Sequence, residues 1–104
     1  MEIGSGWGES AIRLARQTGC TVTTLTLSEE QFKFVQNRIQ QEGLQDRVEI
    51  RLEDYRVHQG KYDRIFSIEM IEAVGHDYLP LYFKSIDRML IDHGIFVLQA
   101  ILLV

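Results

Sequence analysis

Three glycines that alternate with other residues near the start of the sequence form the strongest candidate for a ligand-binding loop. They belong to the segment Glu2-Ile3-Gly4-Ser5-Gly6-Trp7-Gly8, where a predicted strand turns into a helix. A ligand can approach such a loop closely because glycine has no Cβ. A dinucleotide loop of the form G-x-G-x-x-G requires glycine at position 9, where this sequence has Glu9. A carboxylate at the helix N-terminus disfavours pyrophosphate, which argues against NAD or FAD; the alternative is a purely structural turn.

Two carboxylates and one amide form a second candidate site. Glu69 and Glu72 follow the fourth predicted strand, and Gln99 interrupts an apolar run near the end of the sequence. Open parallel sheets bind ligands at the carboxyl ends of their strands, so these side chains are expected at one edge of a sheet. The alternatives are solvated loop charges for the glutamates and a hydrogen-bonded core amide for Gln99.

The histidines and the cysteine show no metal-binding spacing. His58, His76 and His93 fall in predicted loops or at helix ends, and Cys20 is the only cysteine. We therefore predict no metal site and no internal disulfide. Cys20 is expected to begin a buried strand as a packing residue, and a lone cysteine suits a reducing cytoplasm.

The elements that position these residues alternate between strands and helices. Runs of β-branched or alternating apolar residues predict strands, and apolar residues at helical spacing predict helices. The predicted strands are Met1–Ile3, Thr21–Leu27, Arg47–Leu52, Tyr62–Ile68 and Ile95 to about Val104. The helices are indicated by Ala11, Ile12 and Ala15 before Gly19, by Phe32, Val35 and Ile39 between the capping box at Ser28 and Gly43, and by apolar spacing from Leu79 to Leu90 with Pro80 in the first turn.

This alternation predicts an α/β fold with a doubly wound parallel sheet. Charged and apolar residues alternate along Arg47–Leu52, which suits a strand toward the edge of the sheet. The first predicted strand is shorter than the usual ~5–6 residues, and the sequence stops inside an apolar strand. We therefore expect residues 1–104 to be part of one domain that is incomplete at both ends.

The composition is that of one ordinary soluble domain. The 104 residues are 45% hydrophobic and 25% charged and include one proline, which argues against disorder. The net charge is −4 and the basic residues are scattered, so no basic surface for nucleic acid or anionic lipid is expected. No signal segment or membrane-spanning run is present. We expect a cytoplasmic protein whose contact with a membrane, if any, comes from parts outside this sequence.

Five motifs give a specific resemblance to a known family. In order and spacing they resemble the cyclopropane-fatty-acyl-phospholipid synthases over essentially all 104 residues, and they are similar to the mycolic-acid cyclopropane synthases and certain small-molecule N-methyltransferases. An acidic residue before G-x-G-x-G is typical of S-adenosylmethionine (SAM)-dependent methyltransferases, whose ligand has no phosphate and carries a cationic amino group. The motifs are Gly4-Ser5-Gly6-Trp7-Gly8, Thr26-Leu27-Ser28 with Gln31, Asp54-Tyr55-Arg56, Tyr62-Asp63-Arg64-Ile65, and Ser67 through Gly75.

The resemblance implies SAM as cofactor and a set of residues that bind it. Two of these residues have local alternatives, since Gln31 is also the third residue of a capping box and Tyr55 can simply cover the sheet edge. The implied contacts are Gly4 and Gly6 at the methionine end, Thr26, Leu27 and Gln31 along the ribose and methionine, and Asp54 and Tyr55 beside the adenine.

The resemblance also implies a reaction, the transfer of a methylene or methyl group to the double bond of an unsaturated phospholipid acyl chain. The catalytic residues would be Glu72 and Gln99, which would hold a bicarbonate ion that acts as the base. Many family members have histidine at the positions of Ala73 and Gln99. Gln99 can hold an anion through its amide group but cannot titrate. The alternatives are a small-molecule methyltransferase with the same core and an inactive fragment that keeps the cofactor loop.

Overall fold

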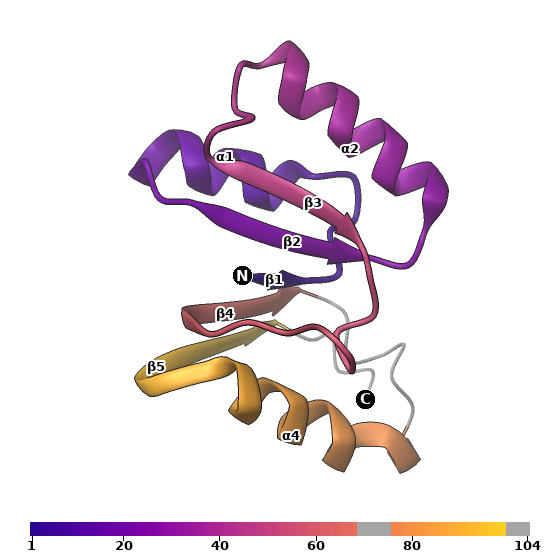
Figure 1. The fold of residues 1–104 in the computed structure, drawn as a ribbon, viewed down its shortest axis with the longest axis vertical. Coiled ribbons are helices and arrows are strands. Elements are labelled where there is room, and N and C mark those ends of the chain that lie inside the picture. Colours follow the sequence, from indigo (N-terminus) through magenta and orange to yellow (C-terminus); the bar gives the residue numbers. More distant parts are fainter. Residues whose placement is uncertain (69–75, 100–104) are drawn as a thin grey trace.

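The computed structural model describes residues 1–68 and 76–99. Within these residues, five strands form one parallel sheet in the order β3-β2-β1-β4-β5. Figure 1 shows α1 and α2 next to β2 and β3, and α4 next to β5 at the other end of the sheet. The elements are β1 (Glu2–Ile3), α1 (Glu9–Thr18), β2 (Val22–Thr26), α2 (Glu29–Gln41), β3 (Val48–Leu52), β4 (Tyr62–Ile68), a 3-10 turn η1 (His76–Tyr78), α4 (Leu79–Met89) and β5 (Leu90–Gln99).

This arrangement confirms the predicted α/β fold with a doubly wound parallel sheet. Strand β1 lies in the centre, because the chain first adds β2 and β3 on one side of it and then β4 and β5 on the other. Strand β3 pairs only with β2 in the described part of the chain, as its charged and apolar alternation predicts for an edge position. At β1 the side on which successive strands are added changes, and doubly wound sheets bind ligands at such a position.

The core consists of two apolar clusters on opposite faces of the sheet. Successive residues of a strand point to opposite faces, so Ile65 belongs to one cluster and Phe66 packs against the other. Helix α4 covers the first cluster through Tyr82, Ile86 and Met89. Helices α1 and α2 cover the second, whose buried members are Ala11, Ala15, Val22, Val35, Ile39, Val48 and Ile50.

The helix ends follow the signals in the sequence. Gly8 and Gly19 both have left-handed backbone angles at the two ends of α1, and the Gly19 N–H donates to the Ala15 carbonyl at 2.9 Å. Ser28 caps α2, since its Oγ accepts a hydrogen bond of 3.1 Å from the Gln31 N–H. Both predicted caps are therefore confirmed.

The last strand begins earlier than predicted. Leu90, directly after α4, already pairs with Tyr62, and the regular register with β4 resumes at Ile95. The residues between them form an irregularity in which His93 has a φ of 65°. The segment Ile91-Asp92-His93-Gly94 has the composition of a loop, and the strand was therefore predicted to begin only at Ile95. The predicted residues 100–104 lie outside the described part of the chain.

One single-residue expectation is wrong. Cys20 is exposed and does not begin β2, because the chain needs two residues after Gly19 before pairing starts at Val22. Trp7 in the glycine loop is 52% exposed, and its ring makes an edge contact with Phe34 at a centroid distance of 5.3 Å. In the described ranges, no helix is long and apolar enough to cross a membrane.

Candidate ligand-binding site

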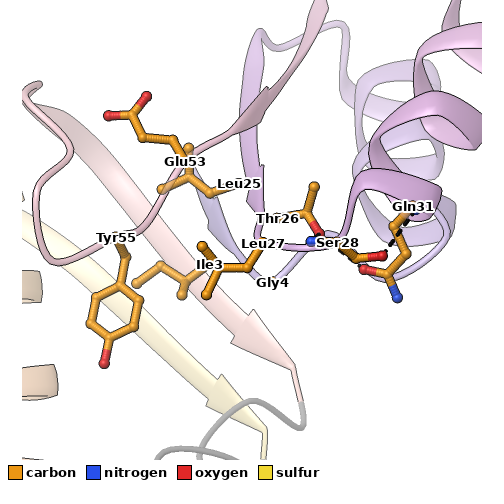
Figure 2. Close-up of a pocket in the computed structure, with 9 residues that line it drawn as sticks. All are labelled: Ile3, Gly4, Leu25, Thr26, Leu27, Ser28, Gln31, Glu53 and Tyr55. Atoms are coloured by element: carbon orange, nitrogen blue, oxygen red, sulfur yellow. Dashed lines mark hydrogen bonds between the residues drawn. The ribbon is translucent and has the colours of Figure 1, made fainter.

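A cavity of about 220 Å³ lies at the carboxyl ends of β1 and β2, beside the loop that follows β3. Figure 2 shows Thr26, Ser28 and Gln31 on one side of it and Glu53 and Tyr55 on the other, where the Glu53 carboxylate and the Tyr55 hydroxyl point away from the remaining lining residues. The middle of the wall is apolar. None of the described residues that line it is cationic, so it offers no charge for a phosphate. The lining consists of Ile3, Gly4, Leu25, Thr26, Leu27, Ser28, Gln31, Glu53 and Tyr55.

The cavity gathers most of the predicted ligand contacts. Gly4, Thr26, Leu27, Gln31 and Tyr55 line it, although their positions in the sequence span half of the chain. Two further predicted contacts, at positions 6 and 54, lie in the adjoining loops and are not part of the lining. Their contact with a ligand therefore stays a prediction.

The glycine loop is anchored by backbone hydrogen bonds to the neighbouring strand. The N–H groups of Gly4 and Ser5 both donate to the Leu25 carbonyl, at 3.0 and 2.8 Å. Gly4 and Gly6 have φ values of 85° and 52°, in the left-handed region that favours glycine. A Cβ at Gly6 would meet no protein atom within 4 Å. The space in front of the loop is therefore open, and the backbone angle, not crowding, requires glycine there.

At one end of the cavity, a short network orients the Gln31 side chain. The Thr26 Oγ1 accepts a hydrogen bond from the Ser28 N–H at 3.1 Å and donates its own proton to the Gln31 Oε1 at 3.0 Å. Because the amide oxygen is used in this way, both protons of the Gln31 amide nitrogen remain available to a ligand. Gln31 contributes only its backbone N–H to the helix cap, because Thr26 takes the Ser28 N–H that the Gln31 side chain would accept in a complete capping box. The Gln31 side chain lines the cavity, and its contact with a ligand stays a prediction.

At the other end of the cavity, the loop after β3 carries Tyr55. Its ring is buried against Tyr82 at a centroid distance of 5.5 Å, and burial raises the pKa of its hydroxyl. Asp54 turns toward Arg56, whose Nη2 donates to it at 2.6 Å, and this hydrogen bond lowers the pKa of the Asp54 carboxyl. The Arg88 guanidinium on α4 donates to the Tyr55 carbonyl at 3.3 Å, which ties the loop to the helix layer.

Glu2 precedes the glycine loop and is almost fully buried. Burial raises the pKa of its carboxyl to about 7, although a hydrogen bond of 2.6 Å from the Thr24 hydroxyl acts in the opposite direction. At neutral pH this carboxyl is therefore divided between its neutral and ionised forms. A cationic group above the loop would favour the ionised form.

His58 is a buried residue that we did not single out from the sequence. Its side chain is only 1% exposed, and its ring nitrogens lie 2.8 Å from the Glu53 Oε1 and 2.7 Å from the Tyr62 hydroxyl. Neither Glu53 nor its contact with His58 was predicted. Alternate residues of a strand lie on the same face of the sheet, so Glu53 continues the face that carries Glu49 and Arg51. This alternation was the one signal in the sequence for the position of Glu53.

The predicted catalytic residues cannot be placed by their side chains. Glu72, together with Glu69 and Ala73, lies outside the described residues, and the side chain of Gln99 is not described. The backbone of Gln99 pairs with Ile68, so the carboxyl ends of β4 and β5 meet at one edge of the sheet. Among the described residues, no group of three or more His, Cys, Asp or Glu side chains is arranged to hold a metal ion.

Fold and cavity together define a class of protein. A doubly wound parallel sheet with a glycine-rich turn after its central strand, and with no cationic side chain among the described residues of its cavity wall, has the architecture of the Rossmann-like methyltransferase core. Comparison with known proteins identifies the family within this class. The chain belongs to the mycolic acid cyclopropane synthetase family, whose family model matches residues 1–104.

Relatives of known activity support this membership. Over 101 residues, the chain is 44% identical to a tuberculostearic acid methyltransferase of Mycobacterium tuberculosis and 42% identical to the cyclopropane-fatty-acyl-phospholipid synthase of Escherichia coli K12. Each alignment covers 97% of this chain but only 23% and 25% of the relative. The chain thus spans about a quarter of the length of the curated relatives it matches.

Solved structures agree with the sequence comparisons. The cyclopropane synthase MmaA2 from M. tuberculosis superimposes with a TM-score of 0.87 at 30% identity, covering 93% of this chain and 34% of that one. The mycolic acid cyclopropane synthase CmaA1, in a complex with SAH and CTAB, gives 0.85 at 28% identity and covers 94% of this chain and 35% of that one. The predicted resemblance to cyclopropane synthases is therefore confirmed.

Proposed function

We propose that the protein carrying this chain is a SAM-dependent methyltransferase that transfers a methylene or methyl group to the double bond of an unsaturated phospholipid acyl chain. The cavity at the carboxyl ends of β1 and β2 carries this proposal, because it unites the glycine turn with Thr26, Gln31 and Tyr55. The names of the relatives point to the same chemistry. The SAH in the CmaA1 structure supports SAM as the cofactor.

The cavity fits SAM better than a dinucleotide. SAM carries a sulfonium and an ammonium group but no phosphate, and the described lining has one carboxylate and no cationic side chain. We assign the methionine part to Gly4 and Gly6, near the buried Glu2 carboxyl. The hydroxyl and amide groups of Thr26 and Gln31 would border the ribose. Leu27, 64% exposed, would be covered by the ligand.

The adenine is assigned to the loop after β3. Tyr55 lines the cavity there with its ring fixed against Tyr82, which provides a rigid apolar surface for a heterocycle. Asp54 is the proposed acceptor for a donor group of the base. Its carboxylate is held by Arg56, and a carboxylate has acceptor sites beyond those that Arg56 uses.

When bound, SAM supplies the electrophilic methyl group that the alkene attacks, and a base then removes a proton as a cyclopropane ring closes. The chain's own residues would orient the two reactants and exclude water. We assign Glu72 and Gln99 to holding the base, which we propose to be bicarbonate. A carboxylate does not attract an anion by charge, so Glu72 would orient other donors, while the Gln99 amide would donate a hydrogen bond to the anion.

The decisive experiment measures cofactor affinity, turnover and product in the intact protein. SAM should raise the melting temperature and NAD should not, and incubation with an unsaturated phospholipid should yield a lipid heavier by one methylene. Glu72→Gln should lower kcat and leave SAM affinity nearly unchanged, because the base acts mainly in the transition state. Gln99→His should retain more activity than Gln99→Leu. A thermal shift with NAD alone, or full activity of Glu72→Gln, would contradict the assignments.

Simple methylation without ring closure is the second candidate outcome. It is favoured by the 44% identity to a tuberculostearic acid methyltransferase and by Ala73 and Gln99, which replace two histidines common in the family. Mass spectrometry separates the two outcomes when the product is first hydrogenated under mild conditions. A cyclopropane and a methylene branch both add one carbon and two hydrogens, so the two products have the same mass. Mild hydrogenation adds two hydrogens to the branched alkene and leaves the cyclopropane unchanged.

A further inference from the structure

The buried His58 connects the start of β4 with the wall of the ligand cavity. Its Nδ1 lies 2.8 Å from the Oε1 of Glu53, the one carboxylate in the described lining, and its Nε2 lies 2.7 Å from the hydroxyl of Tyr62. The rings of His58 and Tyr62 stack at a centroid distance of 5.8 Å. Two side chains of the loop after β3 and one at the start of β4 therefore form one continuous polar connection, which begins at a residue of the cavity wall.

Hydrogen-bonding rules fix the direction of this connection. Ionised Glu53 only accepts, so the Nδ1 of His58 must carry a proton and donate it. In the neutral ring the Nε2 then accepts, and the Tyr62 hydroxyl donates to it. Each of the three side chains then has a hydrogen-bond partner, and the Glu53 carboxylate is the one charged group among them. The carboxylate of Glu53 also receives the Nε of Arg51 at 3.3 Å, but Arg51 is half exposed, which makes that pair weak in water.

The local packing allows little freedom in this arrangement. A Cβ on Gly60 would stand 3.0 Å from the Tyr62 hydroxyl and 3.2 Å from the His58 Nε2. The loop thus passes close to this hydrogen bond, and only glycine leaves room for it. A buried bond of this kind is screened by water much less than the exposed pair with Arg51.

We propose that His58 is a positioning residue for the ligand site: by holding the Glu53 carboxylate through its Nδ1–H, it fixes the Glu53 side chain in the wall at the adenosine end of the cavity. This inference rests on the proposed function, since it assumes that an adenosine-containing ligand occupies the cavity. A glutamate has three side-chain torsions, and a ligand that meets an unfixed side chain must immobilise it on binding. His58 holds these torsions fixed before the ligand arrives.

Two isosteric substitutions separate the two hydrogen bonds of His58. In His58→Asn the amide nitrogen can take the place of Nδ1 and still donate to Glu53, whereas in His58→Gln the amide reaches the position of Nε2 and contacts only Tyr62. By titration calorimetry of the intact protein, His58→Gln should weaken SAH binding about threefold to tenfold, tenfold being about 1.4 kcal/mol. His58→Asn should recover most of that loss. Methylthioadenosine, which lacks the amino-acid part, should show the same ratio between the variants as SAH.

Further readouts distinguish positioning from general stability. His58→Gln should raise KM for SAM while kcat at saturating SAM and KM for the lipid stay the same, and in a Glu53→Ala background the two His58 variants should bind SAH equally. Val57→Ala, an exposed position in the same loop, is the control for folding. Equal losses in His58→Asn and His58→Gln, or a difference that persists without Glu53, would overturn the inference. If the unaltered protein bound no SAH, the proposed function itself would fail.

Discussion

Replacing Glu2 by glutamine should change how the stability of the ligand-free protein depends on pH. Burial raises the pKa of Glu2 from 4.5 to about 7 in the folded chain, so the folded state binds the proton more tightly than the unfolded state. The folded state is therefore favoured most below pH 4.5, and stability is lost as pH rises through about 7. At about 1.4 kcal/mol per pH unit, this interval corresponds to a loss of about 3 kcal/mol.

Glutamine cannot ionise, so Glu2→Gln should not suffer this loss. The Thr24 hydroxyl, which donates to the Glu2 Oε1 at 2.6 Å, can still donate to the amide oxygen. The variant should match the unaltered protein near pH 4.5 and exceed its stability by up to about 3 kcal/mol at pH 8. Urea unfolding at pH 4.5, 6, 7 and 8 measures this difference.

The exposed Asp46→Asn is a matched control, because it removes a carboxylate that is not buried. Its stability difference from the unaltered protein should vary little over the same range of pH. If Glu2→Gln and Asp46→Asn gave the same pH profile, the buried carboxyl would be ionised without cost. The reasoning from burial would then be refuted.

Three further substitutions test the loop and the caps. Gly8→Ala should lower stability by about 2–3 kcal/mol in urea unfolding, since its φ is 88° and the new Cβ would lie 3.1 Å from both Val35 methyl groups. Gly6→Val should reduce SAH affinity in calorimetry by more than tenfold, because it places a branched side chain at a φ of 52° in the open space before the loop; unchanged affinity in a folded variant would mean that the loop is only structural. Ser28→Ala should cost about 1 kcal/mol of unfolding free energy through the lost cap of α2, and an unchanged denaturation midpoint would contradict this.

The sequence was sufficient to predict elements whose signals are local. Strand β4 begins and ends at the predicted residues, Tyr62 and Ile68, where residues that favour strands follow a polar loop. Helix α1 is bounded by two glycines whose left-handed angles match their expected roles. The parallel pairing of the strands follows from the strand–helix alternation, and the edge position of β3 from its alternating charged and apolar residues.

The features that escaped prediction depend on contacts that the local composition does not reveal. The sequence around His58 is polar and predicts a histidine in a loop. Only the folded structure shows that its ring lies between Glu53 and Tyr62. The start of β5 is set by the pairing of Leu90 with Tyr62, which a loop-like composition hides. The cavity residues Thr26, Leu27 and Tyr55 were predicted only because the motifs of a known family mark them.

The position of β1 has a consequence for how the chain acquires its fold. This strand pairs with partners 22 and 64 residues further along, so both of its neighbours are produced after it. At ribosomal rates of about 5–20 residues per second, Phe66 emerges roughly 3–13 seconds after Glu2. During that interval the glycine turn has one neighbouring strand and lacks the other. Of the five described strands, β1 is synthesised first but gains its second neighbouring strand only when β4 has been synthesised. Until then, the unpaired edge of β1 can pair with other strands.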